Sequence, residues 1–364
     1  MSALTTVPKA KSLLEHDAYL VSVDEYMTFR RQGFLVVRNL VSPAEIQELA
    51  EHTHDLIMGT LPEQLGTTLE STSDKASGTA VQALKAPPAH LTPEEKGDYF
   101  LRLHMLHRQL ELHERYLLHP RVLDVLQALI GPDLLALQTM LFLKGPGKPG
   151  QGWHQDSYYI PTHPDSLCGA WIAIDDCDEL NGALWYAAGS QIEPVYPPES
   201  GYGFGDHQLT GVHGVSGVSN PDDKQNDLSK IADRYPQLLV AAQPGDVVFF
   251  GGHVLHRSKK NWTTDRFRRS FVGHYCNARS FTQWNDGDKD DVDPVTLGSN
   301  KLHILARGDT HLPFAKPRFG TSCAALLSPE ERKQESEYAA MMMGDMESGM
   351  MGSTAADPTK VDDD

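Results

Sequence analysis

The first third of the chain spaces its apolar residues as amphipathic helices do, between residues that begin and end helices. The pattern predicts a helix that opens at Asp24 and stops at Gly33, ahead of the buried strand FLVV. Ser42, Pro43 and Glu45 then form an N-cap, a first-turn proline and a capping-box glutamate. A second helix is therefore predicted to begin there and to bury one apolar face.

Two more helices are predicted before the character of the chain changes. Thr92, Pro93 and Glu95 repeat the capping signature, and the helix that follows is expected to continue to residue 110. Another helix is predicted over residues 120–130, closed by a Gly-Pro pair. Residues 60–90, rich in Gly, Thr, Ser and Pro, show no period and are predicted to be a long loop. The helix after Thr92 would bury one apolar face, made by Phe100, Leu103, Leu106 and Leu110.

Short apolar or β-branched runs alternate with Gly and Pro turns over residues 134–281, which is typical of a β-sandwich or barrel. Within this region, residues 198–235 have few apolar residues and are predicted to be a long insertion between strands. We expect residues 1–330 to form one domain whose helical part covers about 12–131. Residues 331–364 are low in β-branched and aromatic content and are predicted to be a disordered tail.

Composition narrows the class of protein. The chain has 364 residues, of which 40% are hydrophobic and 22% charged, the balance of a soluble globular protein. A formal charge of -17 argues against nucleic acid and anionic membrane as partners. Because no apolar run is long enough to span a bilayer and the start lacks the pattern of a secretory signal, we expect a cytoplasmic location. The four cysteines lack zinc spacing and are expected to be free thiols.

Candidate metal ligands stand in the segment GWHQDSYYIP. His154 and Asp156 are two positions apart, so on a strand both side chains would point to one face and could share an ion. Spacing alone is weak evidence, because composition predicts about 1.4 His-x-Asp triplets by chance and two occur. The second, His163 and Asp165, is flanked by prolines, which favours a surface loop. His154 instead follows a turn and stands among aromatic residues, where an inward-facing strand would start.

Two more histidines follow the buried strand VVFF. His253 and His256 differ by three positions, so on an extended segment they face opposite ways and at most one of them joins a shared site. One such imidazole, added to His154 and Asp156, would complete the two-histidine, one-carboxylate triad that binds non-haem iron. Spacing does not decide which of the two histidines completes it.

Five segments, in order, make residues 30–280 similar to the phytanoyl-CoA dioxygenase family of Fe(II)- and 2-oxoglutarate-dependent oxygenases. They are GPDLLALQTMLFLK, the HQD triplet, DELNGALWYAAGSQ, PGDVVFFGGHVLHRSKKN and DRFRRSFVGHYC. The resemblance implies a mainly β fold, a double-stranded β-helix (jelly roll) with N-terminal helices packed on one sheet. It also implies that His154, Asp156 and His256 bind Fe(II), while His253 is a structural neighbour.

The cosubstrate 2-oxoglutarate chelates iron at one end, so its remote 5-carboxylate needs a separate partner. An arginine fork matches two carboxylate oxygens, and three arginines crowd one predicted strand. The resemblance assigns the role to Arg268, with Arg269 as the fallback, and Arg102 is the nearest match to a further basic residue that binds the cosubstrate in relatives. Gln155 alternates with two ligands, so it would face the metal only if the strand twists. The further cosubstrate contacts implied by the resemblance are Met140, Gln155, Trp171 and Ser258.

Two classes of function remain. The resemblance implies a dioxygenase that uses Fe(II), 2-oxoglutarate and O2 to hydroxylate an unactivated C–H bond of a small-molecule or acyl substrate, releasing succinate and CO2. The alternative is a metal-binding jelly roll without oxygenase activity, either a zinc-type hydrolase or a non-catalytic binding module. The dioxygenase is favoured, because a hydrolase has no use for the distal arginine and a degenerate module should have lost a ligand. Arg257, Lys259 and Lys260 come shortly after His256, and the cluster is either a solvated surface turn or a positive patch that attracts an anionic cosubstrate or substrate.

Overall fold

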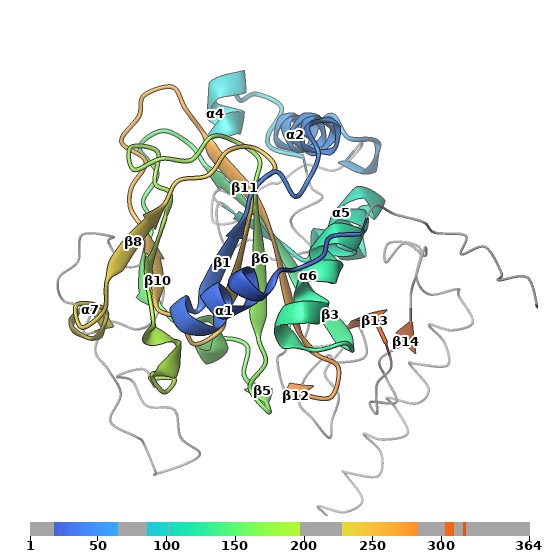
Figure 1. Ribbon diagram of the computed structural model, residues 1–364. Coiled ribbons are helices and arrows are strands. Elements are labelled where there is room, and N and C mark those ends of the chain that lie inside the picture. The colour runs from blue at the N-terminus through green and yellow to red at the C-terminus, as the bar shows by residue number, and fades with distance from the viewer. Residues whose placement is uncertain are drawn as a thin grey trace, which may run out of the picture.

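Two β-sheets face each other in the computed structural model, which describes residues 18–64, 86–100, 102–196, 228–282, 303–308 and 316–317 (Figure 1). The larger sheet runs, in spatial order, through β1 (Phe34–Val37), β9 (Val247–Gly251), β6 (Cys168–Ala173), β11 (Arg268–Asn277), β3 (Leu134–Lys144), β13 (Ile304–Arg307) and β14 (Lys316–Pro317), and β2 (Arg102–His104) also pairs with β3. The smaller sheet runs through β4 (Gln151–His154), β10 (His256–Ser258), β7 (Leu184–Ala187) and β8 (Gln237–Val240). These facing, mainly antiparallel sheets confirm the predicted jelly roll.

Alternation along the strands gives the larger sheet two apolar faces, each with its own core. On the outer face, residues such as Leu141, Leu143 and Phe271 join the largest buried cluster of the molecule, together with side chains from the helices. On the inner face, Val272 and Trp171 belong to a second buried cluster that also contains residues of the smaller sheet. The space between the sheets is therefore bounded by side chains of both.

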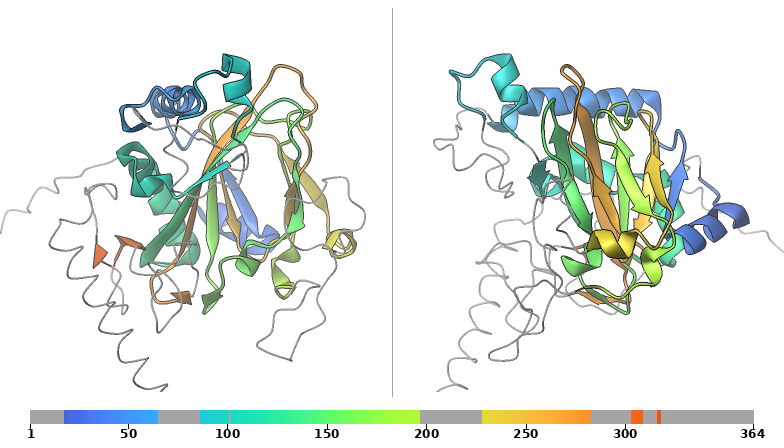
Figure 2. Two further views of the ribbon diagram at one scale, coloured as in Figure 1. Left: turned by 180° about the vertical axis from the view of Figure 1, so that it is seen from behind. Right: turned by 90° about the vertical axis from the view of Figure 1, so that its left-hand side faces the viewer.

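Helices cover the outer face of the larger sheet, away from the smaller one (Figure 2). The capping box predicted at Ser42 is confirmed, because Ser42 accepts the N3 backbone N–H and Glu45 bonds back to it. The first helix begins at Val23, one residue before the predicted Asp24, and Ser22 forms a capping box there that was not predicted. The first ends at Gly33, whose φ of 82° is in the left-handed region that favours glycine. The helices are α1 (Val23–Gln32), α2 (Pro43–Met58), α4 (Pro93–Gly97), α5 (Glu111–Leu117) and α6 (Pro120–Ile130).

The continuous helix predicted from Thr92 to residue 110 is wrong. The capping box at Thr92 is present, but α4 ends at Gly97 after five residues, and β2 and η3 (Leu106–Arg108) come next. The predicted apolar residues are buried, yet Leu103 reaches the core as a strand residue paired with Leu141 of β3. Pairing with the open edge of β3 is therefore more favourable here than forming a helix. The spacing of the apolar residues fits both a helix and a strand.

This local rearrangement turns two polar side chains toward the space between the sheets. Arg102 and His104 flank Leu103 on β2, so they point to the face opposite to it. Both line the cavity that lies between the two sheets. A helix in this segment would not have placed them side by side along the sheet edge.

Smaller elements complete the described chain. His163, predicted to lie in a surface loop, is exposed but belongs to β5 (Thr162–His163), which pairs with β12 (Phe281–Thr282). The prolines on either side limit that strand to two residues. Between the neighbouring strands β7 and β8 the chain carries η5 (Ser190–Ile192) and α7 (Leu228–Ala232), and η1 (Pro62–Gln64) comes after α2.

Several predictions concern residues outside the described chain. These are most of the long loop, at 65–85, most of the insertion, at 197–227, the tail at 331–364, and Cys323. The other three cysteines are buried free thiols: Cys168, Cys177 and Cys276. No described helix is both long enough and apolar enough to cross a membrane.

Candidate active site

Two histidines face each other on adjacent strands of the smaller sheet. His154 is the last residue of β4 and His256 the first of β10, and the two are directly paired across the antiparallel ladder, with ring centroids 4.1 Å apart. Each ring donates its Nδ1 proton to the backbone carbonyl two residues earlier: that of Gly152 at 2.8 Å and that of Val254 at 3.1 Å. A carbonyl only accepts, so Nδ1 carries the proton of each neutral ring, and Nε2 then keeps its lone pair.

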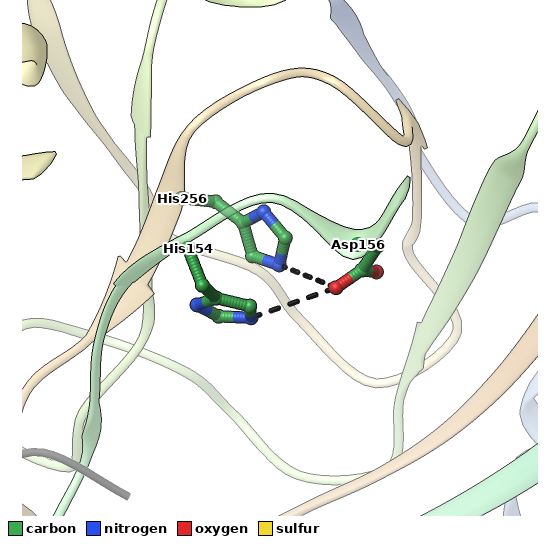
Figure 3. Close-up of side chains that lie close together, drawn as sticks. All are labelled: His154, Asp156 and His256. Carbon is green, nitrogen blue, oxygen red and sulfur yellow. Dashed lines mark ion pairs between the residues drawn. The ribbon is translucent and has the colours of Figure 1, made fainter. Parts of the chain in front are cut away.

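Asp156 completes the group by a different route from the one predicted. Strand β4 ends at His154, and Asp156 is the first residue of η4 (Asp156–Tyr158), so the two do not share a strand face. Its Oδ1 nevertheless lies 3.6 Å from Nε2 of both His154 and His256 (Figure 3). Two atoms bonded at about 2.1 Å to one ion lie at most about 4.2 Å apart, so Asp156 could share an ion with either imidazole. The ligand atoms of all three residues lie within 4.8 Å of one another, as a group that could hold one metal ion does.

The donor set suits non-haem iron. Two neutral imidazoles and one carboxylate are the ligands of the facial triad, which leaves further positions open. Among the described residues, His154, Asp156 and His256 are the one group of three whose ligand atoms lie close enough to share an ion. His253 stands apart from it, because its Nδ1 donates to the Glu193 carbonyl at 3.0 Å and its Nε2 lies 3.4 Å from Asp165.

Electrostatics favour, at His154 and Asp156, the protonation state that a metal requires. Burial lowers the pKa of His154 to about 3, and the neighbouring His256 adds to the effect. Burial alone would raise the pKa of Asp156, but His256, the hydrogen bond from His274 and the charge interactions with His274 and His154 outweigh it and hold that pKa well below its usual value. Near neutral pH the site therefore offers a neutral imidazole at His154 and an ionised carboxylate, as cation binding demands.

The turn before His256 is packed tightly against η4. Ser157 donates its backbone N–H to the Gly252 carbonyl at 2.9 Å, and a Cβ on Gly252 would lie only 2.1 Å from the Ser157 hydroxyl oxygen. Glycine is thus required for this approach. The contact fixes the turn that leads into His256 against η4, which begins with Asp156.

Gln155 faces away from the cavity, which corrects its predicted contact with the cosubstrate. Its Nε2 donates to the carbonyls of Pro194 and His253, at 3.0 and 2.9 Å, and its Oε1 accepts the Tyr196 N–H at 3.1 Å. Gln155 lies just past the end of β4 but its backbone is still extended, with φ of -121° and ψ of 130°, so its side chain points away from that of His154. Gln155 instead ties the two loops beside the triad together.

A cavity of about 390 Å³ opens beside the triad, between the two sheets. Four residues that the resemblance assigned to the cosubstrate line this cavity: Met140, Trp171, Ser258 and Arg268. The sequence also missed residues that line it, namely Gln138, Phe142, Tyr159 and His274. Period-two alternation from Arg268 along β11 was the signal that could have found His274, since both face the same side.

The two neighbouring arginines of β11 point in opposite directions. Arg268 is 2% exposed and lines the cavity, where its Nη1 donates to Ser270 Oγ at 3.1 Å and its buried Nε has no hydrogen-bond partner. Burial lowers the pKa of this guanidinium. Arg269 points to the other face, where its Nε and Nη2 donate hydrogen bonds to the Asp175 carboxylate, at 3.0 and 2.7 Å. Of the pair, Arg268 is therefore the one available to a ligand in the cavity.

Ser258 is prepared to donate a hydrogen bond into the same cavity. Its Oγ accepts a hydrogen bond from the Nζ of the buried Lys144, at 2.9 Å, and one from the Gln151 backbone N–H, at 3.2 Å. A hydroxyl has two lone pairs and one proton, so with both lone pairs occupied its O–H remains free to donate. Lys144, which the sequence pattern did not single out, thus orients Ser258.

The chain is similar in sequence to known proteins. The chain is 26% identical to the peroxisomal phytanoyl-CoA dioxygenase of Bos taurus over 265 residues, covering 71% of this chain and 69% of the relative. It is also 26% identical to a phytanoyl-CoA dioxygenase domain-containing protein of Danio rerio over 279 residues, covering 71% of this chain and 90% of the relative.

Two solved structures share the fold. One is the non-haem alpha-ketoglutarate-dependent carbocyclase SnoK of nogalamycin biosynthesis, with a TM-score of 0.51 and 18% identity over 74% of this chain and 88% of that one. The other is the epimerase SnoN in complex with Fe3+, alpha-ketoglutarate and nogalamycin RO, with a TM-score of 0.50 and 19% identity over 82% and 95%. A family model described as phytanoyl-CoA dioxygenase matches residues 29–270. The chain therefore belongs to the phytanoyl-CoA dioxygenase family of Fe(II)- and 2-oxoglutarate-dependent oxygenases.

Proposed function

We propose that this Fe(II)- and 2-oxoglutarate-dependent dioxygenase hydroxylates an unactivated C–H bond of a small-molecule or acyl substrate, with release of succinate and CO2. The observation that supports it most is Arg268, a buried cation that shares a cavity with the triad and has no acidic partner among the described residues. A zinc-type hydrolase or a binding module would have no use for such a group. Burying an unpaired guanidinium lowers the stability of the fold unless a ligand carboxylate pairs with it.

His154, Asp156 and His256 are proposed to hold Fe(II). When bound, the iron with its cosubstrate supplies the oxygen chemistry that protein side chains lack. The chain contributes geometry. The backbone carbonyls that accept from Nδ1 fix both imidazole planes, so the Nε2 lone pairs converge with Asp156 Oδ1 on one point.

Arg268 and Ser258 are proposed to bind the 5-carboxylate of 2-oxoglutarate. The guanidinium offers an unused N–H, and the Ser258 hydroxyl has its proton free because Lys144 and a backbone N–H occupy its lone pairs. Met140 and Trp171 would supply apolar walls along the carbon chain, which keep water from the reacting end. Gln155 has no part in this site.

The substrate is proposed to carry an anionic group that binds Arg102. Arg102 lines the cavity, and its buried Nε has no hydrogen-bond partner. The turn after His256 is a weaker candidate than its charges predicted, because the Lys259 ammonium lies 3.2 Å from Glu179 and the Lys260 ammonium lies over the ring of the exposed Trp262. A cytoplasmic location stays a prediction, since several relatives are named as peroxisomal.

Replacing His154, Asp156 or His256 by Ala should reduce bound iron from about one ion per chain to nearly none, because two remaining ligands hold Fe(II) weakly. His253→Ala should keep its iron and serves as the matched control, since His253 bonds to Glu193 and Asp165 instead. Iron per chain is measured after anaerobic loading and desalting. Loss of iron from His253→Ala together with its retention in His256→Ala would show that the ligand is assigned to the wrong histidine.

Arg268→Ala should weaken 2-oxoglutarate binding by about 2–5 kcal/mol, as expected when one partner of a buried charge pair is removed. Arg269→Ala is the control, because its side chain pairs with Asp175 on the opposite face, and it should change this affinity little. Calorimetric titration of the Mn(II)-loaded proteins gives both dissociation constants. Equal losses in the two variants would rule out the assignment of Arg268.

Arg102→Gln should raise the KM for the substrate about tenfold, as expected for one charge-assisted contact, and should leave the dissociation constant of 2-oxoglutarate unchanged. The comparison uses a substrate identified by mass spectrometry of metabolite-extract products, with calorimetry for the cosubstrate. If 2-oxoglutarate binding weakens as much as in Arg268→Ala, Arg102 belongs to the cosubstrate site instead.

A metabolite extract incubated with the protein, Fe(II), 2-oxoglutarate and air should yield a product that gains one oxygen atom, with an equal amount of succinate. Mass spectrometry detects both, and Asp156→Ala provides the inactive control because it lacks a ligand. Products that form with Zn(II) alone, gain the elements of water and need no 2-oxoglutarate would support the hydrolase instead.

A further inference from the structure

We propose that His274 is a positioning residue that holds Asp156 Oδ2, so that Oδ1 alone faces the metal. This inference rests on the proposed metal site. His274 Nε2 lies 2.8 Å from Asp156 Oδ2, while Oδ1 of the same carboxylate lies 3.6 Å from Nε2 of both His154 and His256. The two oxygens of Asp156 are therefore divided between a hydrogen-bond donor and the metal position.

Gln138 sets the tautomer that this role requires. Its Nε2 lies 3.0 Å from His274 Nδ1, and the two residues are directly paired across β3 and β11. An amide nitrogen only donates, so Nδ1 of His274 accepts, and the proton of a neutral ring resides on Nε2, which faces the carboxylate. Both side chains are buried, at 5% and 4% exposure, so bulk water does not compete with this chain of bonds.

Asp156 needs such a partner because the sheet does not orient it. His154 and His256 belong to paired strands, whereas Asp156 starts a short 3-10 turn just beyond the end of β4. His274 lies on β11, within the larger sheet, and reaches across the space between the sheets. The hydrogen bond thus fixes Asp156, which belongs to no strand, to a strand that is paired on both sides, with β3 and β6.

Holding Oδ2 also preserves open positions at the metal. A metal ion with six positions, bound by three protein ligands and a two-oxygen cosubstrate, would have one position left for O2. A carboxylate that bound through both oxygens would take that last position. His274 therefore keeps Asp156 as a one-oxygen ligand.

His274→Leu removes the donor and should raise the dissociation constant of Mn(II) about 10- to 100-fold, the usual cost of losing an outer-shell hydrogen bond. Free Mn(II) is measured by electron paramagnetic resonance. The visible spectrum of the Co(II)-loaded variant should also change, because it responds to coordination number. His274→Gln should recover much of the affinity and the parent spectrum, since a Gln amide can place an N–H near the position of Nε2.

The matched control is His253→Leu, which removes a nearby histidine that bonds to Glu193 and Asp165 rather than to Asp156. It should bind Mn(II) as the parent does. Gln138→Leu should weaken binding in the parent and add nothing in the His274→Leu background, because Gln138 acts only through His274. Melting temperatures of the metal-free variants identify any that fail to fold, in which case His274→Gln and Gln138→Leu are compared instead.

The results separate this inference from the proposed function. If the parent and His154→Ala bind Mn(II) equally, the metal site itself is wrong. If the parent binds and His154→Ala does not, but His274→Leu matches the parent in affinity and Co(II) spectrum, the positioning role is overturned. Equal losses in His274→Gln and His274→Leu, or additive losses with Gln138→Leu, would also contradict it.

Discussion

The site depends on one antiparallel pairing, that of β4 with β10. The ladder places His154 directly opposite His256, and each ring is then fixed by its own backbone through a carbonyl two residues earlier. Cross-strand neighbours stand about 5 Å apart, which suits two imidazoles that share an ion. The third ligand, the cavity and the residues around it are arranged about this pair.

The larger sheet supplies the opposite wall. Along β11, Arg268, Val272 and His274 face the cavity, whereas Phe271 and Tyr275 face the helices and belong to the main apolar core. One face of β11 therefore packs in the hydrophobic core, and the other face carries Arg268 and His274 into the cavity. Because that strand lies between β6 and β3, its backbone is hydrogen-bonded on both sides.

Local signals in the sequence predicted much of the fold, and resemblance predicted most of the site. The helix caps at Ser42 and Thr92 could be predicted because a cap depends on only three or four neighbouring residues. The strand after the short helix at Thr92 could not be predicted from local sequence, because burial of Leu103 depends on its pairing with Leu141 of β3, far along the chain. The contact between His274 and Asp156, 118 positions apart, likewise has no local signature.

Residue types alone also left side-chain direction open. Gln155 stands between two ligands in sequence but bonds to the loops behind them, and Asp156 reaches the site from a turn rather than from a strand. Arg268 and Arg269 are adjacent and chemically identical, and only the pleat of β11 separates a cavity residue from a partner of Asp175. Such distinctions arise from backbone geometry, which composition does not encode.

The short strand β2 places two side chains in the cavity that are separate from the candidate metal ligands. Arg102 and His104 reach the cavity from a three-residue strand whose described pairing is with β3 alone, while the ligands and Arg268 lie elsewhere in the fold. Exchanges at these two positions would change the charge and shape of one cavity wall without touching any ligand. The edge of the sheet is thus where new substrate preferences could evolve, or be engineered, while the oxidising chemistry is inherited intact.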